Sequence, residues 1–215
     1  MKQSKLKRQS TLLVARGAVF CAMYVALTYA FMPLAYGAFQ IRPSEGLTLL
    51  PLLYPEAVPA LWIGCMLGNV GSPTGAWDVT VGGAITLVAA LLTRLCHRIK
   101  PRALGVVLGG LPPVLLNAFG LPLLWHLLGA EVLYWPNVGS IALTQAVFVY
   151  AVGVPLVLLC DRLCRKGVGA FLPVSKLPRA QKAVEPISEA QTEVAPSCEG
   201  QEEHREARGE QNIGD

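Results

Sequence analysis

The feature that most constrains this chain is a series of long apolar stretches that are nearly free of charge. They recur at residues 11–33, 47–71, 79–96, 103–128 and 139–160. Each is long enough, or nearly so, to cross a bilayer core of about 30 Å as a helix. Hydrophobic residues make up 53% of the 215 residues and charged residues 15%, a composition that suits lipid better than water. The sequence therefore predicts an all-α membrane protein.

The second stretch, about 46–71, contains three prolines, and Glu56 lies in its middle. Proline removes a backbone donor and disfavours helix in the residue before it, so one straight helix is not expected. We expect two short segments, at about 46–54 and 57–71, that turn at Tyr54-Pro55-Glu56. They form either two spans or a re-entrant hairpin.

Basic clusters decide the number of crossings. Residues 1–16 carry five bases and no acid, which places the N-terminus in the cytoplasm. Six crossings then put the clusters at 94–102 and 162–166 on the cytoplasmic side, whereas five would put both outside. With six, the outer loops hold a single base, Arg42. The positive-inside rule thus predicts six transmembrane helices in the inner (cytoplasmic) membrane, with both termini cytoplasmic.

Three parts of the chain are expected. Residues 1–10 form a basic cytoplasmic N-terminus, and 11–166 form a transmembrane substrate-binding domain. The acidic, polar tail at 167–215 is poor in aromatics, which predicts a disordered cytoplasmic segment. A cleaved signal peptide within 1–37 is the alternative for the start, but its apolar stretch exceeds a typical signal-peptide core.

The first helix carries small residues at every fourth position. Ala18, Ala22, Ala26 and Ala30 fall on one face and would let another helix approach closely. Two interpretations stay open, packing within the chain and docking to a partner.

Sequence motifs for catalysis or nucleotide binding are missing. We find no P-loop, GxSxG elbow, HExxH pair or dinucleotide fingerprint. The six cysteines lack the paired spacing of zinc sites. We therefore expect no catalytic residue, no metal and no cofactor, and energy for transport would come from ion coupling or from another subunit.

Polar residues gather in the predicted outer half of the bundle. Such residues are costly in a membrane and are candidates for function. Jointly they predict a binding pocket for a small polar solute, whereas Glu131 is expected in an exposed loop. The candidates are Gln40, Arg42, Glu45, Asn69, Trp77, Asp78 and Asn117.

Each candidate also has an ordinary structural interpretation. Arg42 and Glu45 are three residues apart and could pair with each other. Asp78 could cap the following helix, Trp77 could belong to an interfacial aromatic belt, and Asn117 could bond a neighbouring helix.

Several ordered motifs resemble the QueT family. They are YGAFQIRPSEGL at 36–47, LLP at 49–51, GCMLGN at 64–69, SPTGAWD at 72–78, LPPVLLN at 111–117 and GVPL at 153–156. The resemblance covers about residues 11–165, and motifs in succession are more specific than any one alone.

The resemblance implies a substrate-binding (S) component of an energy-coupling factor (ECF) importer. Its expected cargo is a queuosine precursor, a 7-deazaguanine base, and no nucleic acid is bound. Its partners would be a membrane coupling subunit, reached through the alanine face, and two cytosolic ATPase subunits. The first outer loop would act as a lid. One departure is Thr144-Gln145, where the family suggests Gly-Glu. Gln145 is therefore added to the substrate-binding candidates, and which precursor is bound stays open.

The chemistry of such a base suits these residues. Glu45 or Asp78 can accept from two neighbouring N–H donors, and Asn117 can both donate and accept. Trp77 or Tyr36 can supply a stacking face. Two other classes remain: a transporter or S component for another vitamin-like solute, and a membrane enzyme that pairs Glu45 with Asp78 as acid and base.

Overall fold

The computed structural model describes residues 2–36, 40–129 and 133–167, and these residues form helices and no strand. The predicted all-α class is confirmed for them. They belong to one compact unit within Met1–Leu177. The tip of the expected lid, Glu131 and the predicted tail beyond Gly167 lie outside the described residues.

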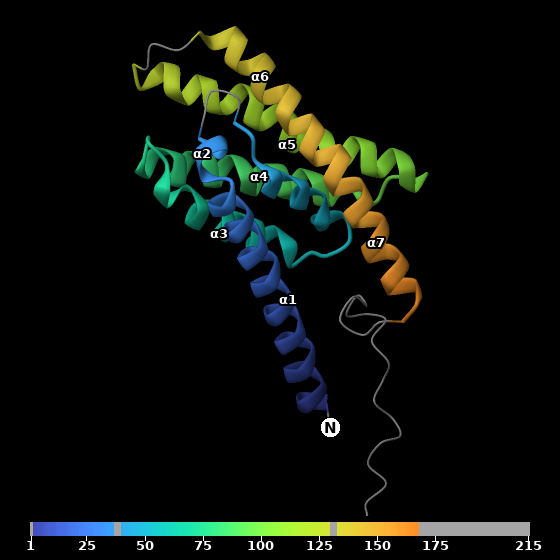
Figure 1. The fold of residues 1–215 in the computed structure, drawn as a ribbon. Coiled ribbons are helices and arrows are strands. Elements are labelled where there is room, and N and C mark those ends of the chain that lie inside the picture. The colour runs from blue at the N-terminus through green and yellow to red at the C-terminus, as the bar shows by residue number, and fades with distance from the viewer. Residues whose placement is uncertain (1, 37–39, 130–132, 168–215) are drawn as a thin grey trace, which may run out of the picture. The chain divides into compact units, whose positions relative to one another are not determined.

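The helical elements follow one another with short connections (Figure 1). Two are 3-10 helical (η1 and η2) and two are π-helical (η3 and η4). In chain order they are α1 (Lys2–Ala30), α2 (Met32–Ala35), η1 (Pro43–Leu52), α3 (Ala57–Gly68), η2 (Asn69–Gly71), η3 (Asp78–Gly82), α4 (Gly83–Cys96), α5 (Arg102–Leu127), α6 (Tyr134–Val147), η4 (Phe148–Gly153) and α7 (Val154–Arg165).

Four helical stretches are long and apolar enough to cross a membrane. They are Ser10–Ala30, Asp78–Cys96, Arg102–Leu127 and Tyr134–Arg165, and the apolar helix at Ala57–Gly71 is shorter. Many large apolar side chains on their outer faces are exposed, as lipid contact requires. The chain is therefore a multi-pass membrane protein. Helix length alone does not confirm the predicted six crossings.

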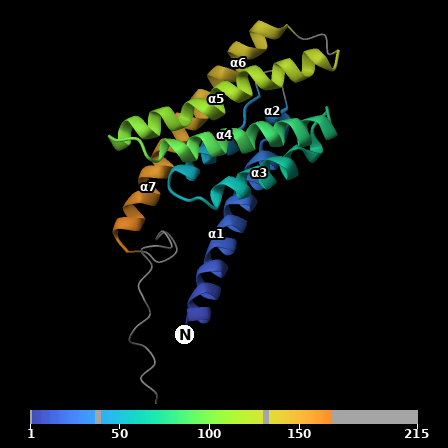
Figure 2. The same ribbon diagram turned by 180° about the vertical axis from the view of Figure 1, so that it is seen from behind.

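The proline-rich region contains two short elements rather than one helix. At about 2.0 Å per residue, the ten residues of η1 extend only about 20 Å. A turn at 53–56 follows, and α3 then begins at Ala57. Because Leu49 and Leu50 are buried and η1 packs against α1, α3, α4, α5, η4 and α7, this short helix forms the centre of the bundle (Figure 2).

Helices α1 and α3 run parallel to each other. Gly17 of α1 faces Ala60 at the start of α3, and Thr28 near the end of α1 faces Gly68 at the end of α3. The chain between them must therefore return through the bundle, which is what η1 does. After η1 and α3 the chain is back at the end of the bundle where α1 finished, as it would be after two additional crossings.

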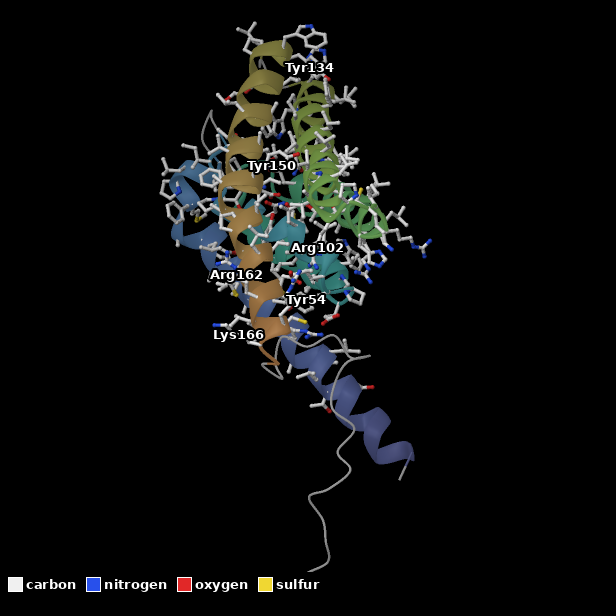
Figure 3. The ribbon with its side chains drawn as sticks, turned by 90° about the vertical axis from the view of Figure 1, so that its right-hand side faces the viewer. Tyr54, Arg102, Tyr134, Tyr150, Arg162 and Lys166 are labelled. Atoms are coloured by element: carbon white, nitrogen blue, oxygen red, sulfur yellow. The ribbon has the colours of Figure 1, made fainter. Side chains whose placement is uncertain are left out.

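The two basic clusters lie at the same end of the bundle. Arg102 at the start of α5 forms an ion pair with Asp161 of α7, with Nη2 and Oδ1 2.9 Å apart. Figure 3 shows Arg102, Arg162 and Lys166 toward one end and Tyr134 at the other. We call the first the basic end. The segments at 31–36, 40–43 and 69–78 lie at the opposite end, called here the loop end.

Close contact between η1 and η4 requires glycine. A Cβ atom on Gly46 would lie 2.8 Å from Cβ of Val152, and one on Gly153 would lie 2.7 Å from the carbonyl oxygen of Gly46. Two glycines thus let the backbones of η1 and η4 touch. This contact brings the start of η1, which carries Glu45, beside the segment that carries Gln145.

Candidate functional site

Glu45 is the most deeply buried acid of the described residues. It lies near the start of η1, is 2% exposed, and accepts a 2.6 Å hydrogen bond at Oε1 from the Tyr24 hydroxyl of α1. The Gln145 side chain of α6 lies beside the same carboxylate. Atom Oε2 of Glu45 is buried and has no hydrogen-bond partner among the described residues. Oε2 of Glu45 can therefore still accept a hydrogen bond inside the bundle.

Arg42 lies close to Glu45 but is held by other groups. Its Nε donates to the carbonyl oxygen of Ala35 at 3.1 Å, and its guanidinium lies 5.1 Å from the centre of the Tyr36 ring. The Tyr36 hydroxyl in turn donates to the carbonyl of Gly68 in α3. Within the described part of the chain, Arg42 and Glu45 form no ion pair with each other. The pairing that their spacing permitted does not occur.

Asn69 and Asp78 form a second cluster of buried polar groups at the loop end. The Asn69 amide donates to the backbone oxygen of Asp78 at 3.0 Å and approaches Sγ of Cys65 at 3.4 Å. The Ser72 hydroxyl donates to Oδ2 of Asp78. Asp78 begins η3 without capping it, and its Oδ1 is buried without a partner in the described ranges. π-helical turns of this kind are frequent at functional sites.

Three amides complete the buried group. Gln40 is 6% exposed, Asn117 5% and Gln145 2%. Gln40 has a backbone φ of +47°, in the left-handed region that a residue with a side chain seldom adopts. Asn117 makes no hydrogen bond to the described neighbours, so the structure does not show the interhelical bond that its position permitted. Oε1 of Gln40 and Oε1 of Gln145 also lack described partners.

Trp77 differs from the other candidates. Its side chain is 55% exposed, whereas the seven remaining candidates are each 6% exposed or less. Tyr36 is half-buried and stacks on Arg42. Of the two aromatic side chains expected to stack on a ligand, Tyr36 is therefore the one in contact with the buried group.

Several residues of the buried group were missed by the sequence reasoning. Tyr24 and Thr28 of α1 contact Glu45 and Ser44, the latter with a 3.0 Å hydroxyl–hydroxyl contact. Thr86 of α4 donates to Sγ of Cys65 at 3.1 Å. A spacing of four places Phe20, Tyr24 and Thr28 on one face of α1, which was the signal available.

The alanine stripe lies on an exposed face of the same helix. Ala18, Ala22, Ala26 and Ala30 are all exposed, while Phe20, Tyr24 and Thr28 are buried. The four alanines therefore do not pack inside the described bundle.

The buried group is rich in acceptors and short of donors. Four oxygen atoms, on Gln40, Glu45, Asp78 and Gln145, are buried and unpartnered among the described residues. Leaving such an atom unpaired costs about 1–3 kcal/mol, so a solute that brings several N–H donors would be favoured there. Hydrophobic helices around a buried polar group of this kind are typical of membrane proteins with a site for a small polar solute, and the group is a candidate for such a site.

Comparison with known proteins agrees with this class. Residues 14–162 match the model of the QueT transporter family, and the chain belongs to that family. The model describes a family of transporters. The assignment confirms the resemblance seen in the sequence motifs.

A curated relative is similar over part of the chain. The queuosine precursor transporter QueT of Lactococcus lactis subsp. cremoris (strain MG1363) is 36% identical over 85 residues, which are 39% of this chain. The match spans half of the relative's length. No solved structure matches this chain.

Proposed function

We propose that this chain is the substrate-binding component of an energy-coupling factor importer for a queuosine precursor, a 7-deazaguanine base. The observation that carries the proposal is the set of four buried, unpartnered acceptor oxygens at the loop end. A 7-deazaguanine offers adjacent N–H donors on its pairing edge, and a carboxylate accepts two such donors at once. Membership of the QueT family and the name of the Lactococcus relative support this cargo.

The proposed roles follow from the surroundings of each side chain. Oε2 of Glu45 accepts from the base, while the Tyr24 hydroxyl holds Oε1 in place. Oδ1 of Asp78 accepts a second set of donors, with Oδ2 fixed by Ser72. Asn117 can donate to the carbonyl of the base and accept from its amine. Gln40, Arg42 and Asn69 shape the wall, and Gln145 replaces a carboxylate that the family resemblance suggests.

The small molecule that copurifies with the protein tests this proposal. The full chain is extracted from membranes of cells grown with 7-deazaguanine bases, and the bound solute is released and identified by mass spectrometry. We expect a 7-deazaguanine in the wild type and its loss in Glu45→Gln. Recovery of a different vitamin-like solute, lost in the same variant, would reject the cargo and favour the second candidate function, a transporter for that solute.

Six passes with both termini in the cytoplasm form part of the proposal. The parallel course of α1 and α3 and the shared end of the two basic clusters support it. Single cysteines at Lys100 and Lys166 should be protected from an impermeant reagent in spheroplasts, and one at Gly75 should react. Labelling at Lys100 from outside would reject the orientation.

The alanine stripe is proposed as the docking face for the membrane coupling subunit. All four alanines are exposed, and small residues let a partner helix approach closely in lipid. Ala22→Trp should abolish uptake while the isolated protein still binds solute. Val107→Trp, on an exposed face of α5, is the matched control and should transport normally. Loss of binding in Ala22→Trp would instead assign the stripe to folding.

A further inference from the structure

A cleft of about 480 Å³ lies at the basic end, away from the proposed substrate site. Its walls come from the turn after η1, the connection from α4 to α5, and α7. Tyr54 and Arg102, which both line it, point to this end of the molecule in Figure 3. The proposed transport function assigns no role to this cleft.

The described residues that line the cleft carry an excess of positive charge. Arg94, Lys100 and Arg102 are cationic, and Asp161 is the single acid among them. Asp161 is already engaged on both oxygens, by Arg102 at 2.9 Å and by Arg165 at 3.0 Å. Asp161 therefore forms no ion pair with Arg94 or Lys100, and an anion entering the cleft would meet a net excess of positive charge on its lining.

Arg94 is oriented for such an anion. Its Nη1 donates to the carbonyl oxygens of Pro51 and Leu52, at 3.0 and 3.2 Å, which fixes the guanidinium under the end of η1. Its Nε and Nη2 form no hydrogen bond with residues in the described ranges. A guanidinium held in place with donors to spare suits the oxygens of a phosphate group.

The remaining walls are apolar and adjoin the lipid-facing surface. Leu53, Val106 and Val157 line the cleft. Leu95 and Leu104, on the neighbouring turns of α4 and α5, are 58% and 45% exposed, as expected for side chains that contact acyl chains. A ligand with a phosphate at one end and a hydrocarbon at the other would match both kinds of wall.

We propose that this cleft binds the phosphate headgroup of an anionic phospholipid from the adjoining leaflet. Arg94 and Lys100 contact the phosphate, and the glycerol and upper acyl chain lie against Leu53 and Val106. Basic pockets between helices at the cytoplasmic side of membrane proteins hold such headgroups. The bound lipid bridges α7 and the connection between α4 and α5.

Native mass spectrometry of the full chain tests the site directly. The protein is titrated with phosphatidylglycerol or with phosphatidylcholine in detergent, and the apparent Kd of each adduct is measured. We expect phosphatidylglycerol to bind more tightly, and Lys100→Gln to weaken it about fivefold, the effect of one basic residue near an anionic lipid. Arg94→Gln should weaken it at least as much.

Arg98→Gln is the matched control, because Arg98 is exposed in the same connection but does not line the cleft. It should change the Kd by less than about twofold, since a screened surface charge contributes little. Arg94→Gln also removes hydrogen bonds to η1, so Lys100→Gln decides the result if the Arg94 variant fails to fold.

Three outcomes would overturn the proposal. Equal binding of the two lipids would show no headgroup recognition. An equal loss in Arg98→Gln and Lys100→Gln would assign the preference to general surface charge. Displacement of the lipid by inorganic phosphate or glycerol phosphate at the same concentration would make the ligand a soluble phosphate compound rather than a lipid.

Discussion

Two glutamates, one near each end of η1, have opposite surroundings. Glu56, just after η1, forms an ion pair with Arg16 of α1, whose guanidinium also lies 4.4 Å from the centre of the Tyr54 ring. Glu45, near the start of η1, has a tyrosine hydroxyl and an amide beside it and forms no ion pair with the described residues. Glu45 is the more deeply buried of the two, and of these two carboxylates only Glu56 forms an ion pair within the described residues.

The difference separates a structural carboxylate from one available to a ligand. A buried ion pair is strongly sensitive to loss of one partner, because the remaining charge is left uncompensated. A buried carboxylate held only by neutral donors keeps its capacity to accept more, and a ligand can supply the missing donors. Glu56 therefore joins α1 to α3, whereas Glu45 is suited to recognise a solute.

Breaking the structural pair should give the largest effect on stability. Arg16→Leu leaves Glu56 charged and unpaired, and we expect a loss of about 3–5 kcal/mol in the free energy of unfolding. Thermal unfolding of the purified protein in detergent measures it. The double variant Arg16→Leu/Glu56→Leu should recover most of the loss.

Arg98→Leu removes an exposed arginine and provides the control, with an unchanged melting temperature. Should Arg16→Leu melt at the wild-type temperature, the ion pair between α1 and α3 would have no structural role.

The equivalent change at the loop end should affect binding instead. Glu45→Gln turns an acceptor into a partial donor that faces the donors of the base. We expect a loss of about 1–3 kcal/mol in binding, or roughly a five- to hundredfold rise in Kd. The melting temperature should stay close to that of the wild type, because no ion pair is broken.

Glu131→Gln, at a position predicted from the sequence to be an exposed loop, is the matched control for this change. A large fall in the melting temperature of Glu45→Gln would contradict the comparison, because Glu45 would then be structural in the same sense as Glu56.

The smallest effect is expected from the neighbour of Glu45. Tyr24→Phe removes the hydroxyl that orients Oε1 and should cost about 0.5–1.5 kcal/mol in binding. Tyr29→Phe on the same helix is the control, since its hydroxyl donates to the backbone oxygen of Leu67, at 3.2 Å, on the exposed side. Equal affinities for the Tyr24→Phe variant and the wild type, measured by isothermal titration, would exclude an orienting role.

Much of this arrangement could be predicted from the sequence. Polar side chains gather in the predicted outer half of the bundle, where they are costly in lipid, so Glu45 and Asn117 were identifiable without coordinates, and Gln145 followed from the family resemblance. Their burial follows from the same cost. Three prolines around Glu56 predicted a broken segment, and the turn between η1 and α3 lies there. Local composition and proline placement determine where helices break and which polar residues are costly in lipid, so both effects can be predicted from the sequence.

Contacts between distant residues could not be predicted in the same way. That Tyr24 meets Glu45, and that Arg16 meets Glu56, depends on the path of η1 beside α1. Whether the alanine stripe packs inside or faces outward was also open, and it depends on which face of α1 the short helices cover. Trp77 lies mostly exposed because the group at the loop end folds inward without it. These are tertiary features that local sequence patterns do not fix.

Equilibrium binding of a labelled 7-deazaguanine base to the purified full-length protein tests the central claim most directly. We expect saturable binding to the wild type and to the Ala22→Trp variant. Binding to Glu45→Gln should be about five- to hundredfold weaker, because one hydrogen bond to a charged group is lost. Absence of measurable binding to folded wild-type protein would contradict the assigned cargo. Equal affinity of the wild type and Glu45→Gln would contradict the assigned site.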